Sequence, residues 1–167
     1  NVWKTYLDSD VPVSELKSAL YSPSFNFTKT GTYSLSFDYR MEAFQAYALG
    51  SYVEISIDGG TQWSHLGTLN SSNNWCSVSG SSHQDLNVDC WSKSESTYKT
   101  ASQDLTAYSG NSDVRFRIVF EIANDGWNPS SIVYLDGFSV DDFAISGPSN
   151  EPSFEIESKL NMTASEV

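Results

Sequence analysis

The sequence predicts an all-β protein, built as a two-sheet antiparallel β-sandwich of jelly-roll type. Several segments alternate apolar and polar residues with a period of two, which is typical of strands with one buried face. Turn sequences rich in glycine, asparagine and serine separate these segments, and no long amphipathic helix interrupts them. The chain has 167 residues, which is enough for one domain with a sizeable core.

Four segments carry the alternation most clearly: residues 33–41, 52–58, 114–122 and 132–145, the last with a break near Gly137. The apolar side chains expected to point inward are Tyr33, Leu35, Phe37, Tyr39, Met41, Val53, Ile55, Ile57, Val114, Phe116, Ile118, Phe120 and Ile122. Because each strand then has one apolar and one polar face, we expect one sheet to pack on another. The best helical window, residues 14–20, is short and runs into Ser22 and Pro23.

A tight hairpin turn is predicted at residues 58–61, between Ile57 and Trp63. The sequence there is Asp-Gly-Gly-Thr, and Asp-Gly favours the positive φ angles that such turns require. We expect Asp58 to close the turn and Trp63 to pack beneath it.

Composition along the chain predicts one module followed by a tail. Residues 1–146 form the β-sandwich, and residues 70–103 form a long insertion in it, rich in serine and asparagine. Residues 147–167 begin with Gly-Pro and continue as a stretch with scattered acidic residues, so we expect a linker or tail. No signal peptide is visible before the strand-like start at Asn1, and we therefore expect a fragment of a longer protein.

The two cysteines, Cys76 and Cys90, bracket a polar loop within the insertion. Their spacing does not suit a redox motif or a zinc site. We therefore predict a disulfide, which would contribute about 3 kcal/mol of stability and would indicate a secreted, extracellular or cell-surface protein. Two free thiols are the alternative.

The charge of the chain excludes some classes of partner. The formal net charge is -12, from 21 acidic and 9 basic residues. A nucleic-acid-binding protein needs a basic surface to neutralise phosphates, and so does a protein that docks on an anionic membrane. No segment approaches the roughly 18 consecutive apolar residues of a membrane span. We expect no nucleic-acid partner and no membrane insertion.

Motifs in a fixed order resemble those of a known family. The segments are residues 20–25, 35–39, 52–63, 104–118 and 137–145, of which the central ones read V-x-I-S-x-D-G-G-x-x-W, D-L-x-x-Y-x-G and V-R-x-R. Together they resemble MAM-like jelly-roll modules, including the cleaved-adhesin modules appended to bacterial secreted peptidases and surface adhesins. The resemblance covers residues 3–146 and implies a non-catalytic accessory domain, often with a structural calcium.

Aspartates are the candidate calcium ligands. Asp141 and Asp142 are adjacent on the closing strand, so their side chains point to opposite faces. Calcium takes about six to eight oxygen ligands, so further groups are needed. Asp8, Asp10 and Asp38 could contribute if the N-terminal segment folds against the last strand. The alternative is that each of these carboxylates is ordinary surface charge.

Aromatic side chains in polar loops are the candidate ligand-binding residues: Trp75, Trp91, Trp127 and Tyr47. Rings beside asparagine, aspartate and glutamine suit stacking on sugars combined with hydrogen bonds to hydroxyl groups. The same rings would equally suit packing beneath a long loop.

The residues offer little support for catalysis. The only histidines are His65 and His83, and neither lies in a recognisable catalytic motif. Paired carboxylates for glycoside hydrolysis meet only in space, so counting does not exclude them. Residues 56–63 also resemble a sialidase Asp-box, but that motif normally repeats and this chain has one copy.

Three functions remain open. The first and favoured one is a non-catalytic accessory module that binds a polysaccharide or glycoprotein, within a larger secreted bacterial protein such as a peptidase. The second is a structural spacer or folding-assistance domain that contacts only its parent protein. The third is a glycoside hydrolase.

Three N-x-S/T sequons begin at Asn26, Asn70 and Asn161. In a chain rich in serine and asparagine, chance accounts for them, and a bacterial host would leave them unmodified.

Overall fold

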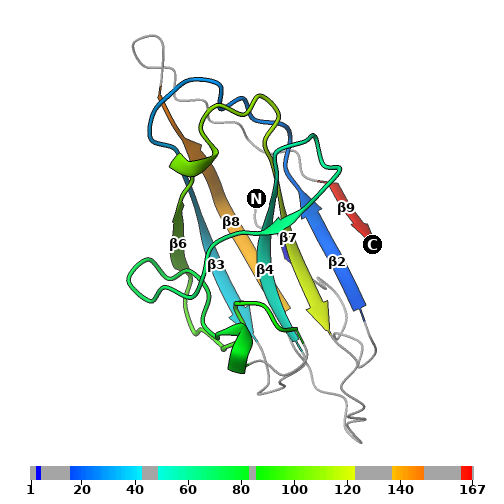
Figure 1. Cartoon of the computed structure of the whole chain (residues 1–167). Coiled ribbons are helices and arrows are strands. Elements are labelled where there is room, and N and C mark those ends of the chain that lie inside the picture. The colour runs from blue at the N-terminus through cyan, green and yellow to red at the C-terminus, as the bar shows by residue number, and fades with distance from the viewer. Residues whose placement is uncertain are drawn as a thin grey trace, which may run out of the picture.

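The computed structural model describes residues 3–4, 16–42, 49–82, 86–122, 137–148 and 163–166. The strands are β1 (Trp3–Lys4), β2 (Leu16–Tyr21), β3 (Ser34–Glu42), β4 (Leu49–Ser56), β5 (Ser64–His65), β6 (Lys99–Asp104), β7 (Arg115–Ile122), β8 (Gly137–Ser146) and β9 (Thr163–Glu166). They form two antiparallel sheets, ordered β1-β8-β3-β6 and β5-β4-β7-β2-β9 (Figure 1). The sheets pack face to face, so the predicted all-β sandwich is confirmed.

The four-stranded sheet is built around β3, which pairs with β8 on one side and β6 on the other. Every second residue of β3 is buried between the sheets, and the residues between them are only partly buried. The buried set is Leu35, Phe37, Tyr39 and Met41. This alternation is the one predicted from the sequence.

The five-stranded sheet is built around β7, which pairs with β4 and β2. The predicted inward residues of these strands are largely buried: Val53, Ile55, Val114, Phe116, Ile118 and Phe120. The prediction for Ile57 is wrong, because β4 ends at Ser56 and the Ile57 side chain is 50% exposed. Ile122, at the last position of β7, is only partly buried.

Strand β2 lies where the sequence offered its best helical window. Its six residues pair with β7 from Leu16 opposite Ile122 to Tyr21 opposite Arg117. The window is too short to form a stable helix by itself, so pairing with a neighbouring strand decides its conformation.

Two further strands lie in the segments that the sequence assigned to the insertion and to the tail. Strand β6 lies largely within the predicted insertion 70–103, so the excursion from the sheets ends before Lys99. Only Ala101 of this strand is buried. For that reason its sequence does not alternate between apolar and polar residues, which would have indicated a strand. Strand β9 lies in the predicted tail 147–167 and pairs with β2, so these four residues extend a sheet.

The core between the sheets is rich in aromatic rings. Its largest fully buried side chains include Trp75, Trp91, Tyr39, Phe27, Phe37, Phe116, Phe120 and Phe138. A second, smaller cluster lies on the outer face of the five-stranded sheet and consists of Ala19, Tyr52, Cys90 and Val119. A bridge between Ser51 and Trp91 places the insertion at the edge of β4, so Trp91 enters the core while Cys90 joins the outer cluster.

Helical structure in the described ranges is limited to two short 3-10 turns, Gly80–Ser82 and Thr106–Tyr108. Among these residues, no helix has the length and apolar character needed to cross a membrane.

Candidate functional site

The structure places two of the predicted ligand-binding aromatics in the core. Trp75 and Trp91 are both 0% exposed, and their rings pack on each other with centroids 5.2 Å apart. The Nε1 of Trp75 donates to the carbonyl of Leu66 (2.9 Å), and the Nε1 of Trp91 donates to the carbonyl of Asn74 (3.0 Å). Neither ring is available to a ligand, so packing, the alternative interpretation, is correct for both. Trp127 and Tyr47 lie outside the described residues.

Other aromatic rings gather on the outer face of the five-stranded sheet. Trp63 and Tyr21 lie edge to face with ring centroids 5.7 Å apart, and both are partly buried. The guanidinium of Arg117 lies over the Trp63 ring at 4.6 Å and near the Tyr21 ring at 5.9 Å. Glu54 completes the group, which we call the Trp63 cluster: Tyr21, Glu54, Trp63 and Arg117.

The register of three strands creates this cluster. Glu54 on β4 lies directly opposite Arg117 on β7, and Arg117 lies directly opposite Tyr21 on β2. These three side chains therefore project from one row of the sheet, on the face that points away from the core. The hairpin after β4 then brings Trp63 over the same row.

The charges of the cluster are neutralised within it. The Nε of Arg117 donates to Glu54 at 2.5 Å, and these side chains are only 14% and 15% exposed. Burial acts to lower the pKa of Arg117, but hydrogen bonds to Glu54 and Tyr21 outweigh it, so the net pKa shift is upward. A guanidinium held between two rings and a carboxylate is rigid, which suits a preformed surface.

A second polar group lies along the same face. The hydroxyl of Tyr52 donates to Glu121, and Lys17 contacts both the Tyr52 hydroxyl (2.9 Å) and the Glu121 carboxylate (3.1 Å). Burial, followed by the bond to Glu121, raises the pKa of Tyr52 well above its ordinary value. The phenol therefore stays protonated and acts as a hydrogen-bond donor throughout the neutral pH range.

The hairpin turn beside the cluster has the predicted construction. Gly59 and Gly60 have φ angles of 75° and 93°. The Oδ1 of Asp58 accepts hydrogen bonds from the amides of Thr61 (3.0 Å) and Gln62 (2.9 Å). The Nε1 of Trp63 donates to the carbonyl of Gly60 at 3.0 Å. Asp58 thus closes the turn, and the Trp63 ring packs against it at Gly60, as the sequence predicts.

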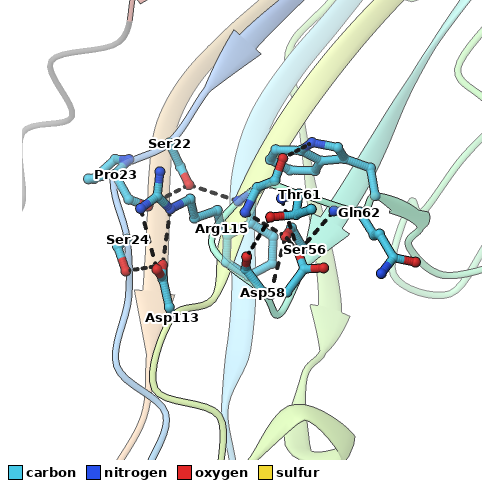
Figure 2. A network of polar contacts seen from close by, with 12 residues as sticks. Ser22, Pro23, Ser24, Ser56, Asp58, Thr61, Gln62, Asp113 and Arg115 are labelled. Carbon is cyan, nitrogen blue, oxygen red and sulfur yellow. Dashed lines mark hydrogen bonds and ion pairs between the residues drawn. The ribbon is translucent and has the colours of Figure 1, made fainter.

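The neighbouring loops carry a separate polar network beside this turn. Figure 2 shows Asp113 between Ser24 and Arg115, next to the turn that Asp58 closes. Asp113 accepts from the Ser24 hydroxyl (2.5 Å) and from the Nε of Arg115 (3.0 Å). A Cβ at Gly59 would lie 2.9 Å from the Oδ2 of Asp113, so the absent side chain allows the two loops to approach closely.

Acid is expected to loosen the turn. The pKa of Asp58 lies below its ordinary value of 3.8, chiefly because the Gln62 amide and then the Ser56 hydroxyl bond the charged form. A depressed pKa contributes stability that is complete above the ordinary value and is lost as pH falls through the folded-state pKa. An NMR titration of the Asp58 carboxyl carbon should therefore give a midpoint below 3.8.

Two variants test whether the hydrogen bonds of the turn lower the pKa of Asp58. Ser56→Ala removes the hydroxyl that donates to the Asp58 carboxylate and should move the midpoint of Asp58 upward. Asp58→Asn should remove the turn's contribution to acid sensitivity altogether. A wild-type midpoint at or above 3.8 would contradict the hydrogen bonding described for this turn.

The predicted calcium ligands do not assemble into a site in the part of the chain that the structure describes. Asp38 and Asp141 lie opposite each other on β3 and β8, next to a register shift, and Asp142 has a φ of 49°. Within the described ranges, no group of three or more potential ligands comes together, although calcium needs about six to eight oxygens. Asp8 and Asp10 lie outside these ranges, so calcium stays a prediction from the resemblance.

Both cysteines are buried free thiols in this structure. They lie on neighbouring backbone segments, since the amide of Ser77 donates to the carbonyl of Cys90 at 2.9 Å. Burial raises the pKa of Cys76 and raises the pKa of Cys90 to about 12. The disulfide between them stays a prediction for the protein in an oxidising compartment.

The sequence matches no protein-family model, and no curated protein matches it. The resemblance to MAM-like modules accordingly stays a prediction, and the candidate site rests on its own geometry.

Sequence reasoning missed the Trp63 cluster for a specific reason. The predicted alternation of residues 114–122 leaves Arg117 between two inward residues and so on the polar face, and Trp63 is predicted beneath the turn. Tyr21, however, follows the segment that was the best helical window. A strand assignment for residues 16–21 would have placed Tyr21 in a sheet, but its position opposite Arg117 depends on the register of β2 against β7.

Proposed function

We propose that this chain is a non-catalytic binding module of a larger secreted protein, and that its ligand is a carbohydrate, either free or on a glycoprotein. The observation that carries the proposal is the Trp63 cluster on the outer face of the five-stranded sheet. Partly exposed rings offer apolar faces for the C–H groups of a sugar. The charged and hydroxyl groups beside them can bond its hydroxyls.

The charge of the chain favours neutral sugars. With a net charge of -12, the protein repels anionic ligands at long range. The one guanidinium in the cluster is already paired with Glu54, so it offers little attraction to a second carboxylate. A neutral polysaccharide avoids the long-range repulsion and does not need a free guanidinium.

Four of the described carboxyl groups do not suit the acid role in glycoside hydrolysis. A glycosidase needs one carboxylic acid with a raised pKa to protonate the leaving oxygen. The described carboxyl groups with a shifted pKa are Asp58, Asp89, Asp104 and Asp113, and all four shift downward. Such groups stay ionised at neutral pH and are poor proton donors.

Trp63→Ala is expected to weaken carbohydrate binding by about tenfold or more, which corresponds to roughly 1.4 kcal/mol. The Trp63 indole is the larger of the two partly exposed rings of the cluster, and its loss also removes the ring that lies nearer to the Arg117 guanidinium. A screen of the full chain on a glycan array, followed by calorimetric titration with the best neutral glycan, measures the effect.

Tyr98→Ala is the matched control, because Tyr98 is 43% exposed and precedes β6, at the edge of the other sheet. It should bind as the wild type does. Equal affinities for wild type and Trp63→Ala would place the ligand elsewhere. A folded wild-type chain that binds no glycan would favour the structural spacer.

A further inference from the structure

Two exposed asparagines use their side chains in the same way. The Oδ1 of Asn26 accepts hydrogen bonds from the amide (2.9 Å) and hydroxyl (2.6 Å) of Thr28. The Oδ1 of Asn70 accepts hydrogen bonds from the amide (3.1 Å) and hydroxyl (2.7 Å) of Ser72. All four residues are exposed. Each asparagine is thus held by its oxygen, and its Nδ2 faces solvent.

The backbone around Asn26 is anchored by the residue between asparagine and threonine. Phe27 is 1% exposed, and its ring stacks on Tyr33 with centroids 4.1 Å apart. The amide of Phe27 donates to the carbonyl of Asn111 at 2.8 Å. Because the central side chain points into the core, the two flanking side chains are directed outward.

The backbone at Asn70 is anchored by a different contact with the same result. Asn70 and Trp75 exchange two backbone hydrogen bonds, of 2.8 and 2.9 Å, and the Trp75 ring is fully buried. The turn that they close carries Ser72 on its surface. Two unrelated loops thus present the same tripeptide arrangement.

Three of the other described asparagines donate hydrogen bonds from the side-chain nitrogen that Asn26 and Asn70 leave free. The Nδ2 of Asn73 donates to the carbonyl of Ser102 (2.7 Å). Those of Asn74 and Asn111 donate to other backbone carbonyls, at 2.9 and 2.8 Å. In the described residues, Asn26 and Asn70 make no such bond. Their amide nitrogens can therefore be substituted without loss of a structural hydrogen bond.

The sequence alone ascribes these sequons to chance, but the geometry at two of them points to a use: we propose that Asn26 and Asn70 are acceptor sites for N-linked glycans, a proposal that rests on the proposed secretion of the chain, here through a eukaryotic pathway. Both belong to N-x-S/T sequons, the pattern that a secretory oligosaccharyltransferase recognises. The donor is an oligosaccharide carried on a lipid pyrophosphate. Asparagine Nδ2 forms a bond to the anomeric carbon, the bond from that carbon to the pyrophosphate oxygen breaks, Nδ2 loses one proton, and the lipid pyrophosphate leaves.

The test is secretion of the full chain, behind a signal sequence, from eukaryotic cells whose secretory pathway carries this transferase. Peptide mass spectrometry after enzymatic deglycosylation in heavy-oxygen water should show Asn26 and Asn70 converted to labelled aspartate. Asn26→Gln and Thr28→Ala should each remove the first glycan, and Asn70→Gln and Ser72→Ala the second. Thr28→Ser and Ser72→Thr should retain them.

A second measurement addresses the structure itself. The glycosylated chain and the unmodified chain from a bacterial host should unfold at temperatures within about 3 °C of each other, because Nδ2 carries no structural bond. Unmodified asparagines in the secreted chain, alongside a glycosylated reference protein from the same cells, would overturn the proposal. A clear loss of thermal stability on glycosylation would contradict the structural basis of the proposal, namely that Nδ2 makes no bond that the fold needs.

Discussion

Replacing Trp91 with alanine is expected to destabilise the protein by about 3–5 kcal/mol, the range for fully buried aromatic side chains. The ring lies 5.2–5.7 Å from the rings of Trp75, Tyr39, Phe37 and Phe138. Its removal leaves a cavity where the insertion meets both sheets, and it leaves the carbonyl of Asn74 without the indole donor.

Urea denaturation followed by circular dichroism measures this loss, with Trp63→Ala as the matched control. Trp63 is only partly buried, so we expect its loss to cost about 1–2 kcal/mol. If Trp91→Ala cost no more than Trp63→Ala, the ring would not be a core residue, and the interpretation of Trp91 as a surface ligand-binding side chain would regain support.

Gly67→Ala is expected to destabilise the protein by about 3 kcal/mol, from a clash combined with backbone strain. A Cβ at this position would lie 2.3 Å from the Nε1 of Trp75 and 2.8 Å from the Oε1 of Gln103. The indole nitrogen would have to move, although it donates to the carbonyl of Leu66. The φ angle of 76° also disfavours any side chain there.

Gly110→Ala separates the two causes of this effect. Gly110 also has a positive φ, of 99°, but a Cβ there would have no atom within 4 Å. We expect it to cost about 1 kcal/mol, from backbone strain alone. Equal midpoints for the two variants in urea denaturation would contradict the close approach of Gly67 to the Trp75 indole.

Strands in which apolar and polar residues alternate strongly could be predicted, because burial of one face requires an apolar residue at every second position. In β3, Leu35, Phe37 and Tyr39 are apolar and buried, while Ser36 and Asp38 are not. The same holds at Phe116 and Ile118 of β7. The hairpin turn could also be predicted, because Asp-Gly satisfies local backbone requirements that do not depend on distant contacts.

Strands that depend on their neighbours could not be predicted in this way. In β2, Ala19 and Leu20 are both buried although they point to opposite faces, because the outer face of the sheet carries its own apolar cluster. In β6 the residues are mostly polar, and pairing with β3 supplies the stability. Neither segment therefore shows a regular alternation of apolar and polar residues in the sequence.

The residues of the candidate site also depend on contacts between distant parts of the chain. Loop position alone suggested that Trp75 and Trp91 were surface rings, but the insertion folds back and places both between the sheets. The cluster of Tyr21, Arg117 and Trp63 needs the register of β2 against β7 and the direction of the hairpin. These relations join residues about 40 to 100 positions apart, which local propensity does not specify.

The sequence by itself determined the fold class, the inward faces of β3 and β7, the hairpin that Asp58 closes, and the acidic charge of the chain. Each depends on residue type and on spacing over a few positions. Only the tertiary structure decided which aromatic rings are buried, which lie beside Arg117, and which asparagine nitrogens are free. The physical reason is that burial is settled by what packs against a side chain, and that partner comes from a distant part of the chain.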